Sequence, residues 1–180
     1  MQSATVLLEL SRMCLIRDQG DAMRRTKGFS LVELLIVVAI ILVIAAIAVP
    51  SFLHSRMAAN ESAAVASLRT LNTAQISYNS AYPTVGFAGT LGVLAGTSCT
   101  PPNSGSACLI DTELAGGVRS GYSFTLTNVT GTPNSAYNVI AAPTLWNYSG
   151  VRYFCSYEDA VVRFSMATIT TCDNNTAPQP

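Results

Sequence analysis

Residues 28–50 read GFSLVELLIVVAIILVIAAIAVP, and the part from Leu34 to Val49 is an unbroken run of 16 apolar residues. Counted from Phe29, the apolar segment has 21 residues, of which only Ser30 and Glu33 are polar. An α-helix rises about 1.5 Å per residue, so this segment would be roughly 32 Å long, close to the roughly 30 Å hydrocarbon thickness of a bilayer. The sequence therefore predicts a helix that crosses a membrane.

The charges around this segment favour one orientation. Arg24, Arg25 and Lys27 lie just before it, and Lys27 is the only lysine in the chain. Because basic flanks stay in the cytoplasm, we expect a single span with the N-terminal end inside and the rest outside. Over the whole chain ten basic and ten acidic side chains cancel, which leaves nucleic acid as a partner open. Only 11% of the residues are charged, a composition that disfavours a wholly soluble cytosolic enzyme.

Two simple interpretations of the segment leave one residue unexplained. A plain signal anchor accounts for the length and the basic flank. A secretory signal peptide would be cut after Ala46-Ile47-Ala48, an A-x-A pattern, but the apolar run exceeds the usual roughly 7–15-residue h-region. Neither interpretation explains why the carboxylate of Glu33 lies four residues after Phe29.

A third interpretation rests on the order Gly28-Phe29-Ser30-Leu31-Val32-Glu33 ahead of the apolar run, with Pro50 at the end of the run. Together with the basic flank, this stretch closely resembles the class III signal of type IV pilins and type II secretion pseudopilins. The resemblance implies that a prepilin peptidase cuts between Gly28 and Phe29 on the cytoplasmic side and methylates the new amino terminus of Phe29. Glycine suits the position before the cut, because it lets the backbone approach a catalytic site closely.

The resemblance also implies a function in assembly. The chain would be a structural subunit, without enzymatic activity or cofactor, that polymerises with copies of itself through the apolar helix into a type IV pilus-like filament. Glu33 would pair with the amino terminus of an adjacent subunit. The other partners would be the prepilin peptidase, the inner-membrane assembly platform and, before assembly, the lipid bilayer. The protein would first be a single-pass inner-membrane protein and then part of an extracellular or periplasmic filament.

Alternatives remain within and outside this family. A minor pilin or a type II secretion pseudopilin shares the same motif. A signal-anchored surface protein that never polymerises is the alternative from another class, and Glu33 argues against it because an intramembrane acid is expensive without a partner. The sequence has no Walker loop, G-x-S-x-G elbow or H-E-x-x-H motif that would indicate an enzyme.

The sequence departs from the family pattern in two places. The family's leader often has about half a dozen residues, whereas 28 residues precede the expected cut. A start at Met23 would restore a short leader and would leave Cys14 outside the protein. Leu42 stands where many type IV pilins carry a helix-loosening glycine, which leaves Pro50 as the expected break in the helix.

Beyond the apolar run the pattern predicts an α+β fold. We expect a leader over 1–28, one helix over 29–82 with its transmembrane part at 29–50, and a β-sheet head over 83–180. An apolar stripe at helical spacing should hold the sheet: Met57, Ala64, Leu68, Leu71 and Tyr78. After an irregular connection over 86–112, four short antiparallel strands are expected at Tyr122–Leu126, Tyr137–Ala142, Val151–Ser156 and Ala160–Ser165. The resulting architecture is type IV pilin-like, a long N-terminal α-helix packed on a small antiparallel sheet.

Four cysteines lie in the expected head, at Cys99, Cys108, Cys155 and Cys172. An even number in an exported region favours disulfides. Of the three possible connectivities we prefer Cys99–Cys108 with Cys155–Cys172, because each pair joins neighbours in sequence. Their spacing lacks the C-x-x-C pair typical of a zinc site.

Two pairs of acids are the remaining candidates for a metal. Asp111 with Glu113, and Glu158 with Asp159, are the pairs that would contribute to a calcium site, as C-terminal loops of some secretion pseudopilins do. Neighbouring acids on a turn are more often solvated, so we predict no metal site and keep calcium as the alternative.

Overall fold

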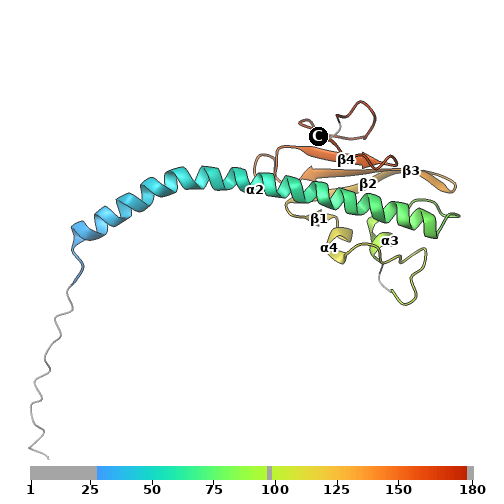
Figure 1. The fold of residues 1–180 in the computed structure, drawn as a ribbon, viewed down its shortest axis with the longest axis horizontal. Coiled ribbons are helices and arrows are strands. Elements are labelled where there is room, and N and C mark those ends of the chain that lie inside the picture. The colour runs from blue at the N-terminus through green and yellow to red at the C-terminus, as the bar shows by residue number, and fades with distance from the viewer. Residues whose placement is uncertain (1–27, 97–98, 178–180) are drawn as a thin grey trace, which may run out of the picture. The chain divides into compact units, whose positions relative to one another are not determined.

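The computed structural model describes residues 28–96 and 99–177 (Figure 1). The elements in chain order are α2 (Leu31–Ala81), α3 (Leu91–Ala95), α4 (Thr112–Ala115), β1 (Val118–Arg119), β2 (Tyr122–Gly131), β3 (Asn134–Pro143), β4 (Tyr153–Tyr157) and β5 (Arg163–Ser165). The chain divides after Val43 into two compact units, and the second of these, from Ile44 onward, contains the sheet. Apart from Gly28, the expected leader lies outside the described residues.

Helix α2 is 51 residues long and contains Pro50 in its interior. The break expected at Pro50 is therefore wrong. Proline has no N–H, so the carbonyl of Ala46 loses its usual donor, but this removes only one hydrogen bond from a long ladder. The helical turns on both sides of Pro50 remain intact.

The sheet has five antiparallel strands in the order β1-β2-β3-β4-β5, each paired with the next along the chain. The longest pairing joins β2 to β3, from Tyr122 opposite Pro143 to Gly131 opposite Asn134. Figure 1 shows the C-terminal half of α2 running alongside this sheet. The predicted α+β fold, one long helix packed on a small antiparallel sheet, is confirmed.

The strands differ from the predicted ones in number and length. Strand β1 has only two residues, too short for an alternating pattern to reveal. The last strand begins at Arg163 and not at Ala160, because Ala160 has φ 60° and a left-handed residue cannot continue a strand. The connection over 86–112 contains the one-turn helix α3, whose first turn is capped by the Thr90 hydroxyl.

The core forms where α2 meets the sheet. Leu68, Leu71 and Tyr78 of the predicted stripe are at most 1% exposed, whereas Met57 is only half-buried. They share one apolar cluster with the large side chains of the sheet, chiefly Tyr122, Phe124, Tyr137, Val139 and Phe154. Burial of this stripe is the main apolar contribution that holds the head on the helix.

Two buried amides on the same face of α2 bond to the head. The Gln75 amide donates to the Ala88 carbonyl (3.1 Å) and accepts from the Ala88 N–H (2.8 Å). The Asn72 amide donates to the Ser156 hydroxyl (2.8 Å) and to the Ala160 carbonyl (3.1 Å). Because a buried amide is costly without partners, these contacts fix the position of the helix along the sheet.

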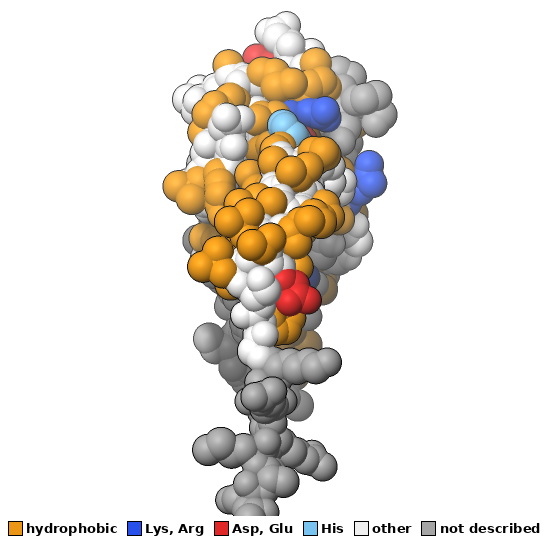
Figure 2. All heavy atoms as spheres, turned by 90° about the vertical axis from the view of Figure 1, so that its left-hand side faces the viewer, with side chains coloured by type: hydrophobic (Ala, Val, Ile, Leu, Met, Phe, Trp, Pro, Cys, Tyr) orange, Lys and Arg blue, Asp and Glu red, His pale blue; other side chains and the backbone are white. Residues whose placement is uncertain are grey.

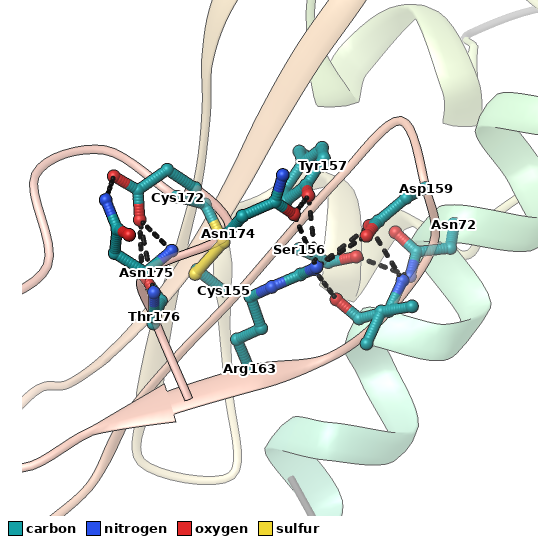
Figure 3. The surroundings of a disulfide bond; sticks show 12 residues. Asn72, Cys155, Ser156, Tyr157, Asp159, Arg163, Cys172, Asn174, Asn175 and Thr176 are labelled. Atoms are coloured by element: carbon teal, nitrogen blue, oxygen red, sulfur yellow. Dashed lines mark hydrogen bonds and ion pairs between the residues drawn. A yellow bond between two sulfur atoms is a disulfide. The ribbon is translucent and has the colours of Figure 1, made fainter. Parts of the chain in front are cut away.

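Two disulfides occur in the head, Cys99–Cys108 and Cys155–Cys172, the same pairs that were preferred from the sequence. The second joins the C-terminal tail to strand β4 (Figure 3). Both of its cysteines are buried, in a small second cluster with Ile140 and Ile169.

A buried ion pair lies beside this disulfide. The Arg163 guanidinium makes two bonds to the Asp159 carboxylate, at 2.6 and 3.0 Å, and lies 4.4 Å from the centre of the Tyr157 ring (Figure 3). Arg163 is 7% exposed. The Tyr157 hydroxyl in turn bonds to Asn174 of the tail. One cation thus links the turn after β4, the start of β5 and the C-terminal tail.

The charges of this pair shift each other's protonation. Burial alone would raise the pKa of the Asp159 carboxyl, but hydrogen bonds from Arg163 and from the Val161 N–H outweigh burial and hold that pKa below its ordinary value. The bond with Asp159 raises the pKa of Arg163. Asp159 is therefore engaged in an ion pair. Asp111, the other candidate for calcium, caps α4 and pairs with Arg119 at 2.8 Å.

Asp159→Asn should reveal what the pair contributes to the head. Asparagine keeps the shape but leaves Arg163 without an opposite charge, so the free energy of unfolding at pH 7 should fall by about 1.5–3 kcal/mol. The measurement is urea unfolding of the full chain in a non-ionic detergent. Asp111→Asn is the matched control: its ion pair is exposed, asparagine still caps a helix, and the loss should stay below about 1 kcal/mol.

The same pair of proteins should show a defined pH dependence. The Asp159 pKa is lower in the folded than in the unfolded chain, so its stabilisation is complete above the ordinary value of 3.8 and is lost as the pH falls through the folded pKa. The stability difference between wild type and Asp159→Asn should stay constant from pH 7 to about 5 and shrink below about pH 4. A difference that is unchanged down to about pH 2 would contradict this assignment.

Candidate assembly site on the exposed helix

The N-terminal half of α2 carries large apolar side chains that no part of the described chain covers. Exposure is 77% for Leu31, 60% for Ile44 and 75% for Ile47. Figure 2 shows hydrophobic side chains crowded together, with few charged ones among them. A continuous apolar surface of this size on a protein marks contact with another molecule or with a membrane.

This half of the helix also passes the physical test for a membrane span. Its most apolar 18-residue window has a mean hydropathy of 3.3, and none of that window is buried. Among the described residues, α2 is the one helix long and apolar enough to cross a bilayer. A buried core helix of a soluble protein would pass by composition and fail by burial, so its exposure separates α2 from that class.

The residues at the expected cut lie at the open start of this helix. Phe29 is 78% exposed, and a side chain added at Gly28 would meet nothing within 4 Å among the described atoms. Both residues precede the first helical residue, Leu31. An extended, open peptide bond is what a protease needs, because a helical backbone holds its carbonyls and N–H groups in internal bonds.

Glu33 lies in the first turn of α2 and is exposed. The partial positive charge of a helix N-terminus favours a carboxylate there by about 0.3–1 kcal/mol. Within residues 28–96 and 99–177, the Glu33 carboxylate has no hydrogen-bond or ion-pair partner. It is an acid surrounded by apolar side chains, and its partner must come from outside the described chain.

A second carboxylate on α2 has the opposite character, because it fastens the head to the helix. One oxygen of Glu61 accepts from the backbone N–H groups of Val151 (2.9 Å) and Arg152 (3.2 Å), and the other lies 3.5 Å from the Arg152 guanidinium. Next to it, the Asn60 amide donates to the Ser149 carbonyl at 3.0 Å. No sequence pattern indicates this contact, since the partners are backbone groups about ninety residues away.

The other predicted site residues have structural surroundings. The four cysteines form the two disulfides of the head, and Asp111 and Asp159 are held by arginines. In the described ranges, no three histidine, cysteine, aspartate or glutamate side chains are grouped as metal ligands would be. Of the predicted set, Gly28, Phe29 and Glu33 share the start of α2.

Known proteins resemble this chain at its N-terminal region and over short stretches. Residues 23–49 match the family described as the prokaryotic N-terminal methylation motif. The type IV major pilin protein PilA of Myxococcus xanthus is 48% identical over 54 residues, which are 30% of this chain and 24% of that protein. The type IV wide pilus major component PilA4 of Thermus thermophilus is 50% identical over 46 residues, 26% of this chain and 35% of that protein.

The aligned stretches thus span about a quarter of one pilin and about a third of the other. No solved structure matches the chain. The methylation motif falls on the segment that contains Gly28, Phe29 and Glu33, and the long apolar helix continues from it into an α+β head. By its methylation motif, its likeness to two pilins and its fold, the chain belongs to the type IV pilin family.

Proposed function

We propose that this chain is a prepilin whose mature form polymerises through α2 into a type IV pilus-like filament. The observation that carries the proposal is the exposed apolar half of α2 with the unpartnered carboxylate of Glu33 at its start. A lipid bilayer would cover the apolar side chains but would leave the carboxylate without a partner. Neighbouring copies of the same helix would satisfy both.

The driving force of assembly must differ from ordinary hydrophobic burial. Lipid tails are as apolar as leucine, so moving α2 from the bilayer into a filament gains little apolar transfer energy. Close packing between helices and specific polar contacts must supply the difference. At about 4 Å and an effective dielectric constant near 20, an ion pair between Glu33 and the Phe29 amine of a neighbour gains roughly 4 kcal/mol before desolvation is deducted.

Membrane insertion precedes this step. The basic residues Arg24, Arg25 and Lys27 would keep the leader in the cytoplasm, so the head emerges on the outer side. A prepilin peptidase would then cut after Gly28, and an inner-membrane assembly platform would move the subunit into the fibre. The subunit is structural in this scheme and catalyses no reaction.

A minor pilin or a type II secretion pseudopilin would use the same helix in the same way. Both relatives are named as major pilus components, and this favours a major subunit over those alternatives. A membrane-anchored protein that never polymerises would have no use for Glu33, which makes the carboxylate the place to test the proposal.

The first test concerns processing. We expect the mature protein to begin at Phe29 and to carry one methyl group on its amino terminus, because Gly28 and Phe29 form the open peptide ahead of α2. Intact-mass measurement of the protein from its native membrane should show this mass. Gly28→Val, which adds a branched side chain at the cut, should give the uncut chain. A mature protein that begins at Val49 would instead indicate an ordinary secretory signal peptide.

The second test concerns Glu33 itself. Glu33→Leu should insert as well as wild type and still be cut after Gly28, since the apolar segment only becomes more apolar. Filament yield should fall at least tenfold, because losing about 1.4 kcal/mol per contact already weakens each association step by that factor. Membrane and sheared-surface fractions are blotted side by side to separate insertion from assembly.

Two control variants make this result specific. Glu33→Gln keeps the shape and hydrogen-bonding capacity but removes the charge, and it should also assemble poorly. Ser30→Ala changes the other polar residue of the segment and should give filaments at the wild-type level. Normal filament yield from Glu33→Leu would show that this carboxylate does not drive subunit docking.

A further inference from the structure

The connection between β3 and β4, residues 144–150, carries large side chains that face solvent. We call it the aromatic loop. Leu145 is 60% exposed, Trp146 53% and Tyr148 51%. Three large apolar or aromatic side chains within four residues at the tip of one loop form a concentrated patch, of the kind that marks an interaction surface.

Internal contacts hold the aromatic loop in a fixed shape. The Trp146 ring stacks on the Tyr153 ring, with 5.5 Å between centroids and 21° between planes. The buried Ser149 hydroxyl donates to the Leu145 carbonyl (3.0 Å) and accepts from the Leu145 N–H (3.1 Å), and the Asn147 N–H donates to the Gly150 carbonyl (3.0 Å). The exposed rings are therefore presented by a structured turn.

The aromatic loop is fastened to α2 just past the end of the apolar run. The Arg56 guanidinium lies 5.4 Å from the centre of the Tyr148 ring, and the Asn60 amide bonds to the Ser149 carbonyl. Arg56 is the first arginine or lysine after Lys27, and it is exposed. These contacts all lie within the compact unit that begins at Ile44, which also contains the last turn of the apolar run.

The distance along the helix matches the thickness of a membrane interface. Arg56 follows Pro50 by six residues, which is about 9 Å of helix. The polar headgroup region of a bilayer adds roughly 5–8 Å beyond the hydrocarbon on each side. Between them, Phe52 is 67% and Leu53 39% exposed, so apolar helix surface continues toward the loop. With the apolar run in the hydrocarbon, the level of Arg56 and Tyr148 falls at the headgroups.

The residue types are those that such an interface takes. Tryptophan and tyrosine concentrate at the boundary between lipid and water, where an apolar ring and a polar tip are both satisfied. Arginine places its apolar stem against the lipid and its guanidinium on headgroup phosphates. A hollow of about 270 Å³ opens between helix and loop beside Arg56, and it is lined partly by polar side chains, including Asn60 and Thr144.

We propose that the aromatic loop and Arg56 dock on the outer headgroup layer of the bilayer, as a second membrane contact of the subunit before assembly. The inference rests on the proposed function, because it requires α2 to span the membrane with the head outside. The loop holds the head down on the membrane while the subunit waits, and it leaves the lipid when the subunit enters a filament.

Trp146 makes this contact directly measurable, because it is the only tryptophan in the chain. The full chain is reconstituted into vesicles of phosphatidylcholine with a minor fraction of phosphatidylglycerol. Lipids brominated at shallow or at deep acyl positions serve as quenchers from the membrane side, and iodide serves from the water. We expect shallow bromines to quench Trp146 severalfold more than deep ones, and iodide to quench it weakly.

A matched control moves the tryptophan to a part of the head far from the interface. Leu109 is 39% exposed and borders a groove beside Thr73 and Ser77, about 25 Å further along α2 than Arg56. In the variant Trp146→Phe with Leu109→Trp, the fluorescence should respond strongly to iodide and not to brominated lipid. Replacing both Leu145 and Tyr148 by serine, which are exposed and carry no core packing, should raise iodide quenching of Trp146 severalfold with α2 still inserted.

The outcomes separate the two proposals. A chain that alkaline carbonate extracts from the vesicles would overturn the membrane anchor, and the docking with it. A chain that stays inserted while Trp146 is as open to iodide as the tryptophan at position 109 would overturn the docking alone. Shielding of Trp146 in sheared filaments but not in vesicles would also overturn it, and would assign the aromatic loop to a contact between subunits.

Discussion

Helix α2 requires two different surroundings along its length, and the rest of the structure follows from this constraint. From Ala64 to Tyr78 the helix supplies buried side chains to the core of the head. From Leu31 to Leu53 its large side chains have no cover within the described chain. Water is a poor solvent for that surface, so this half of the helix needs lipid or copies of itself. Membrane anchoring and polymerisation are then two solutions to one physical problem.

The polar side chains of α2 connect these two roles. A head attached only through apolar contacts could slide along the helix, because hydrophobic burial has no direction. Glu61, Asn72 and Gln75 bind backbone or buried polar groups of the head, so each can be satisfied at one register only. Glu33 extends the same logic beyond the subunit, as an unsatisfied group at the start of the helix that a neighbour's amine would satisfy.

The sequence was informative where one residue type repeats over many positions. The apolar run and the stripe that contains Leu68 and Leu71 predicted the helix, its exposure and its packing face. Local exceptions were not readable: Ala160 adopts a left-handed conformation that no residue pattern indicated, and the helix tolerates Pro50 because losing one bond does not end a 51-residue ladder. The contacts of Glu61 depend on groups distant in sequence, which periodicity cannot reveal. Gly28 and Glu33 were found because their motif is local.

The most direct measurement of the central claim is a density map of sheared filaments, obtained by electron cryomicroscopy, at a resolution that shows side chains. The account predicts that the segment from Leu31 to Val49 lies at the filament axis, in contact with the same segment of neighbouring subunits. It also predicts that the Glu33 carboxylate lies within about 4 Å of a neighbour's Phe29 amine. Filaments held together through their heads, with this segment outside the core or Glu33 facing solvent, would contradict the account.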